Sequence, residues 1–109
     1  MTHEDIWTPP FQCSKYSWNI TDSKHHMVFT ALCDEDTKER ITKLLNGDSS
    51  VEKFKSAKVV NAQLLLDYQL VGVFRGWGHL TGKGALGLSA DDAIKIQNDF
   101  IAECLDKLM

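Results

Sequence analysis

The stretch RGWGHLTGKGALG, residues 75–87, holds five of the seven glycines of this 109-residue chain, next to an arginine, a tryptophan, a histidine and a lysine. Glycine-rich loops hold phosphates through backbone N–H groups, but only at certain spacings. The phosphate-binding loop requires glycine where Trp77 stands and a hydroxyl side chain where Gly84 stands. The dinucleotide-binding fingerprint requires a third glycine where Thr81 stands. The spacing therefore predicts neither motif.

Three interpretations of this stretch remain. It is a bend in which glycine permits positive φ angles, or its backbone amides from Gly76 to Gly84 hold a small ligand or nucleotide, or it is a recognition surface. Arginine and tryptophan often dominate interface energies, and here they lie on a connection between elements. The candidate partner-binding residues are Arg75, Trp77, His79, Thr81 and Lys83.

Histidine and cysteine, which are common in catalytic and metal sites, are not spaced for either role. The histidines lack H-x-x-x-H and H-x-x-E spacing, the cysteines lack C-x-x-C spacing, and no segment resembles a nucleophile elbow. We therefore expect no catalytic residue, metal site, cofactor or enzymatic activity, and we expect reduced cysteines that serve packing. These residues are His3, His25, His26, His79, Cys13, Cys33 and Cys104.

Length and composition favour one globular domain over residues 1–109, with residues 1–10 as an N-terminal arm. Apolar residues make up 43% of the chain and charged residues 25%, which is enough apolar surface to form a core. The net charge of -3 repels phosphate, so a nucleic acid partner is not expected. No run approaches the roughly 20 apolar residues that span a bilayer. The start of the chain lacks a secretory signal, so we expect no membrane contact and a cytoplasmic location.

Hydropathy patterns predict two hairpins and two helices. Residues 11–32 alternate as a hairpin with its turn at Asp22 and Ser23, which pairs Trp18 with Met27 and Tyr16 with Phe29. Residues 58–75 predict a second hairpin with its break at Asp67 and Tyr68, although one helix is the competing interpretation.

The helices carry clear start signals. The acidic residues 34–36 favour the start of a helix over a metal site, and Gly47 ends that helix. Ser89 and Asp92 form a capping box before a longer helix. We therefore predict an α+β domain in which two β-hairpins form a mainly antiparallel four-stranded sheet with two helices packed on one face. The inward stripes are predicted as Ile41, Leu44 and Leu45, then Ala93, Ile96, Phe100, Cys104 and Leu108.

The apolar start WTPPF, residues 7–11, has two interpretations. It packs on the sheet edge, where proline prevents further strand pairing, or it binds a partner.

Five stretches of the chain resemble small, acidic accessory proteins that bacteriophages and prophages often carry. They are WTPPF, NITDSKHHMVF, KLLNG, RGWGHLTG and the IQNDF of the last helix. The resemblance implies an accessory role in a bacterial cytoplasm, with direct binding to a host or defence protein. It transfers no catalytic or binding residue to this chain.

These patterns predict a non-enzymatic protein that acts by protein–protein binding. The alternatives are a small-ligand or nucleotide binder that uses the loop 76–84, and a self-associating structural module such as a homodimer that pairs through an open sheet edge.

Overall fold

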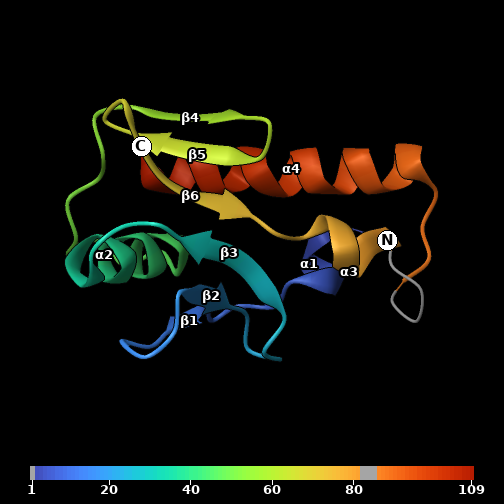
Figure 1. Cartoon of the computed structure of the whole chain (residues 1–109), viewed down its shortest axis with the longest axis horizontal. Helices are drawn as coiled ribbons and strands as arrows, with labels where there is room; N and C mark the ends of the chain where they lie inside the picture. Colours follow the sequence, from blue (N-terminus) through green and yellow to red (C-terminus); the bar gives the residue numbers. More distant parts are fainter. Residues whose placement is uncertain (1, 82–85) are drawn as a thin grey trace.

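The chain folds into an antiparallel sheet with helices packed against it (Figure 1). The computed structural model describes residues 2–81 and 86–109. None of the helices in these two ranges is long and apolar enough to cross a lipid bilayer. In chain order, the elements are α1 (His3–Ile6), β1 (Gln12–Cys13), β2 (Asn19–Thr21), β3 (Met27–Ala31), α2 (Glu35–Leu45), β4 (Ala57–Val60), β5 (Gln63–Leu66), β6 (Gln69–Phe74), α3 (Trp77–Thr81) and α4 (Ala90–Leu108).

Within the described ranges the sheet has six antiparallel strands, in the order β1-β2-β3-β6-β5-β4, and the helices number four. The predicted four-stranded sheet with two helices is therefore wrong. Part of the difference is a turn at Asn61 and Ala62, whose φ angles are 51° and 65°. This turn divides the expected second hairpin into the three-stranded meander β4-β5-β6, with the predicted break at Asp67 and Tyr68 as its other turn. Asparagine adopts positive φ more readily than most residues but alanine rarely does, so the sequence marks the first turn only at Asn61.

The first hairpin also differs from the prediction, because β1 is a separate strand and the register of β2 and β3 is shifted. Ile20, rather than Tyr16, lies opposite Phe29. The connection between β2 and β3 is longer than expected, because the buried carboxylate of Asp22 accepts backbone hydrogen bonds from two residues of the turn, at 2.8 and 3.0 Å. The shift buries Ile20 and leaves Tyr16 86% exposed.

The two predicted helices are confirmed as α2 and α4. The Asp34 side chain caps α2 by accepting a hydrogen bond from the N–H of Thr37 at 2.8 Å, and Gly47 follows with a φ angle of 81°. The Ser89 side chain caps α4 by accepting from the N–H of Asp92 at 3.3 Å. The predicted apolar stripes of both helices are buried: Ile41, Leu44, Leu45, Ala93, Ile96, Phe100, Cys104 and Leu108.

The N-terminal segment is built into the core. Ile6, Trp7 and Phe11 are all buried. The backbone N–H of Phe11 donates to Oδ1 of Asn46 at 2.6 Å, and Nδ2 of Asn46 donates back to the carbonyl of Phe11 at 2.8 Å. This reciprocal pair fastens the WTPPF stretch to the end of α2, so its aromatic side chains are not displayed to a partner.

Gly76 shows why one glycine of the segment 75–87 is needed. It lies between β6 and α3, and a Cβ atom there would lie 2.4 Å from the ring of Trp7. Such a distance is a steric overlap, so only glycine allows the chain to pass this ring. The bend at this position is therefore a consequence of core packing.

Phe100 of α4 lies at the centre of the core. Its ring centroid lies 4.5 Å from that of Trp7, 6.2 Å from that of Phe11 and 6.3 Å from that of Phe74. These neighbours come from the N-terminal segment and from β6, and α4 also contacts α1, α2, α3 and β4. The long helix thereby joins elements from both ends of the chain.

We expect Phe100→Ala to reduce the free energy of unfolding by about 3–5 kcal/mol, because it leaves a cavity among three aromatic rings. Ile94 lies on the same helix but is 47% exposed, so Ile94→Ala should change the free energy by less than about 0.5 kcal/mol. Urea denaturation followed by circular dichroism measures both. Similar losses in the two variants would contradict the central place of Phe100.

Candidate binding surface

The strand register determines which side chains point away from the helices. Residues directly opposite each other on neighbouring strands point to the same face of a sheet. Ile20, Phe29 and Phe74 form one such row, and all three are buried. The adjacent row crosses five strands and must point to the other side. It consists of Asn19, Thr30, Val73, Gln63 and Val60.

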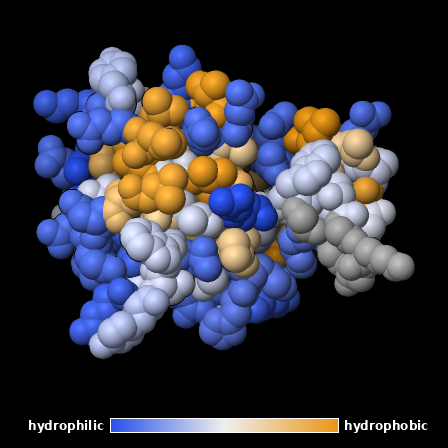
Figure 2. Space-filling view, in the orientation of Figure 1, coloured by the Kyte–Doolittle hydropathy of each residue, from blue (hydrophilic) through white to orange (hydrophobic). Residues whose placement is uncertain are grey.

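This outer side is an exposed apolar surface, which we call the open sheet face. A second outward row consists of Leu70, Leu65 and Lys58. Leu70 is 46% exposed and Val60 is 43% exposed, which are high values for aliphatic side chains. Figure 2 shows the result as an orange patch over β4, β5 and β6. Exposed apolar patches bordered by polar residues commonly mark interaction sites.

The charged side chains of the open sheet face are positive. Lys58 is the only charged side chain within the six described strands, and Arg75 follows directly after β6. The Nε of Arg75 donates a hydrogen bond to Oγ1 of Thr30 at 3.3 Å, which places the guanidinium group beside the outward row. The face therefore combines aliphatic side chains with cations and, in its described strands, contains no carboxylate.

The predicted partner-binding residues divide into separate groups. Arg75 is exposed and joins the open sheet face, and Trp77 is 41% exposed at the start of α3. The hydroxyl of Thr81 donates a hydrogen bond to the carbonyl of Trp77 at 2.9 Å, so it is engaged within α3. Lys83 lies outside the described residues.

His79 is half-buried and stacks on His26, with ring centroids 4.4 Å apart. Nδ1 of His26 lies 3.2 Å from Oδ2 of Asp22, which also accepts a hydrogen bond from the backbone N–H of Thr8 at 3.0 Å. The sequence reasoning did not single out Asp22 and His26 as a pair. The signal for it is an aspartate in a turn that is followed four residues later by a histidine.

The Asp22–His26 pair resembles the carboxylate and base of nucleophilic enzymes, in which a hydroxyl or thiol completes the group. Within the described part of the chain, no serine, threonine or cysteine side chain hydrogen-bonds to His26 or His79. The carboxylate instead satisfies backbone N–H groups of the turn and of the N-terminal segment. The geometry therefore indicates a structural role for this cluster.

The pKa values of Asp22 and His79 are both lowered. Burial raises the pKa of Asp22, but hydrogen bonds from three backbone N–H groups and the nearby His26 ring lower it more, so that the net pKa lies below 3.8. Burial lowers the pKa of His79 below 6.5, and the neighbouring His26 lowers it further, while Asp22 acts in the opposite direction.

The described part of the glycine segment is a short helix rather than an open loop. The N–H of Leu80 donates to the carbonyl of Gly76 at 3.1 Å, and the N–H of Leu88 donates to the carbonyl of Leu80 at 3.0 Å. Amides engaged in this way are not available to a phosphate. The ligand-binding interpretation also involves Gly82 and Gly84, which lie outside the described residues.

Residues that could hold a metal ion come together elsewhere, where α1 meets α4. His3, Glu4 and Glu103 place one ligand atom each within 4.8 Å of one another. The three cysteines, all in the described ranges, are free, and burial raises the pKa of Cys104 to about 12. Its thiol is therefore neutral and inert at physiological pH.

Comparisons of the chain with protein-family models, with curated proteins and with solved structures find no match. The resemblance to phage and prophage proteins therefore stays a prediction, and the function must be argued from the surface itself.

We expect Asp22→Asn to lower the free energy of unfolding by about 1–3 kcal/mol near neutral pH, because the amide cannot accept all the hydrogen bonds of the carboxylate. The folded pKa lies below 3.8, so this contribution is present above that pH and is lost as the pH falls through the folded pKa. The difference between the two proteins should therefore shrink in acid. Urea denaturation over a pH series measures it. Exposed Asp36→Asn is the control, and a pH-independent difference would contradict the assignment.

The lowered pKa of His79 also makes folding stability fall with pH, but in weak acid rather than near pH 3.8. Because the folded pKa is lower than 6.5, the unfolded chain takes up the proton first, and folding stability decreases as the pH falls below 6.5. We expect His79→Gln to reduce this dependence between about pH 7.5 and about pH 5.5. Chemical denaturation at both values tests it, with His25→Asn as the exposed control, and an unchanged dependence in the His79 variant would contradict the prediction.

Proposed function

We propose that this chain is a non-enzymatic binding protein that holds a partner protein against its open sheet face. The partner segment presents apolar side chains flanked by carboxylates. If the resemblance to phage and prophage proteins is correct, the partner is a host or defence protein of a bacterial cytoplasm, and the chain modulates it by occupying one of its surfaces.

The single observation that supports this proposal is the exposure of aliphatic side chains on a sheet whose opposite side is covered by α4. Val60 and Leu70, which belong to the two outward rows, are 43% and 46% exposed. A rigid sheet orders few residues on binding, so burial of these side chains contributes to affinity with a small entropic cost.

Charge favours a partner of different composition over a second copy of the chain. The face carries Lys58 and Arg75, and its described strands carry no carboxylate, so two copies packed face to face would have no acids to pair with these cations. Carboxylates of a partner would pair with them, and arginine makes two-pronged hydrogen bonds to such groups. Complementary charge of this kind also speeds association.

Selection of binders from a random peptide library against the immobilised chain tests the proposal. We expect the selected peptides to combine apolar residues with aspartate or glutamate. Leu70→Ser, Val60→Ser and Arg75→Gln should each weaken binding of these peptides about fivefold or more, because each removes an apolar or ionic contact to the partner. Fluorescence titration gives the affinities, and rising salt should weaken them.

Matched variants on α4 control for changes that are unrelated to the face. Ile94→Ser removes an exposed aliphatic side chain and Lys95→Gln removes an exposed cation, and neither should alter peptide affinity. Equal weakening by the α4 variants, or selected peptides without acidic residues, would contradict the proposal. A dimer in sedimentation that Leu70→Ser dissociates would instead assign the face to a second copy of the chain.

A further inference from the structure

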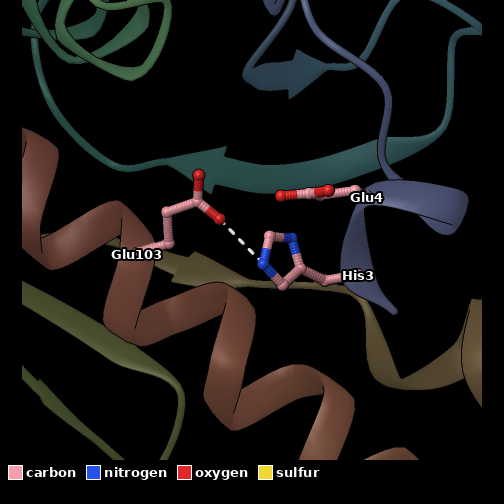
Figure 3. Close-up of side chains that lie close together, drawn as sticks. All are labelled: His3, Glu4 and Glu103. Carbon is pink, nitrogen blue, oxygen red and sulfur yellow. Dashed lines mark ion pairs between the residues drawn. The ribbon is translucent and has the colours of Figure 1, made fainter. Parts of the chain in front are cut away.

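Three potential metal ligands from opposite ends of the sequence converge where α1 packs on α4. Figure 3 shows the side chains of His3 and Glu4, from α1, lying close to that of Glu103, from α4. Nε2 of His3 lies 2.7 Å from Oε2 of Glu103, and one ligand atom from each of the three residues falls within 4.8 Å of the others.

The core positions these side chains. The ring of His3 lies against that of Phe100, with centroids 5.7 Å apart, and α1 contacts α4. Residues His3 and Glu103 are both half-buried, whereas Glu4 is exposed. His3 is therefore held by packing and Glu103 by its ion pairs with His3 and Lys107. Exposed Glu4 can adjust its rotamer to bring its carboxylate to the shorter spacing of a metal site.

A cavity of about 250 Å³ adjoins the three side chains. Its walls include all three ligands together with Trp7, Phe100 and Lys107. Trp7 is buried, and its indole Nε1 has no hydrogen-bond partner among the described residues. Because this nitrogen is fully buried, Trp7 lines the cavity with its other atoms.

We infer that His3, Glu4 and Glu103 form a binding site for Zn²⁺, and that the adjoining cavity admits a fourth, exogenous oxygen ligand. One imidazole nitrogen and two carboxylates are a donor set that zinc accepts, and three protein ligands leave one position of a tetrahedral ion open. The site is distinct from the open sheet face and does not depend on the proposed binding function.

Charge and donor type select zinc over the common alkaline-earth ions. The two carboxylates balance the charge of a divalent cation. Nζ of Lys107 lies 3.4 Å from Oε1 of Glu103, but it also donates to the carbonyl of Leu45 at 3.3 Å, so the lysine is held to one side. Mg²⁺ and Ca²⁺ prefer oxygen-only sites with more ligands, whereas imidazole suits zinc.

Isothermal titration of the untagged chain with Zn²⁺ tests this inference. We expect one ion per chain, and His3→Gln and Glu103→Gln should each weaken binding about 100-fold or more, because a direct ligand matters more than its supporting shell. Glutamine preserves side-chain length and hydrogen bonding at position 103, so the variant should still fold. Zinc should raise the thermal midpoint of the natural chain but not that of either ligand variant.

The control variants are His25→Asn and Glu39→Gln, which remove an exposed imidazole and an exposed carboxylate from other parts of the molecule. Both should bind zinc as the natural chain does. Co²⁺ used as a spectroscopic probe should show a tetrahedral spectrum without a thiolate charge-transfer band. Unchanged zinc affinity in both ligand variants, Mg²⁺ binding of equal strength, or a thiolate band would each overturn the inference.

Discussion

The ring of Phe100 is the contact on which the rest of the fold depends. It packs against Trp7 and Phe11 from the beginning of the chain and against Phe74 at the end of β6. Aromatic rings are large, so a cluster of this kind fixes the distances between the elements that supply it. It brings α1 onto α4, which places His3 beside Glu103, and it holds the end of β6, from which Arg75 leaves the sheet. Both proposed sites are therefore positioned by one cluster.

The sequence predicts the features that depend on residues close to one another in the chain. The caps Asp34 and Ser89 and the buried stripes of α2 and α4 follow from spacing within one or two helical turns, and they are confirmed. The strands are less predictable because their register depends on side-chain hydrogen bonds and turn angles that residue spacing does not reveal. Asp22 shifts the first hairpin by binding backbone N–H groups, and Ala62 takes a positive φ that its side chain disfavours. Secondary-structure propensities alone predict neither the shifted register of the first hairpin nor the positive φ of Ala62.

The same distinction separates the predicted from the unpredicted parts of the candidate sites. Arg75 was identifiable because an arginine beside a tryptophan on a connection is a local signal. The open sheet face was not, because Val60 and Leu70 are known to point outward only once five strands are aligned. Likewise, His3 and Glu103 lie at opposite ends of the sequence, so histidine spacing alone indicated no metal site. Only the packing of α1 on α4 brings them together.

Trp7 links the two regions physically. One part of its ring lies so close to Gly76 that a Cβ atom there would overlap it, and the same residue lines the cavity beside His3. The junction between β6 and α3 therefore cannot move toward α1 without displacing this ring, and the ring cannot move without disturbing its contact with Phe100. A densely packed core does not absorb such shifts gradually. The position of Arg75 at the edge of the open sheet face is thus fixed by the same indole that borders the proposed zinc site, although no side chain is shared by the two.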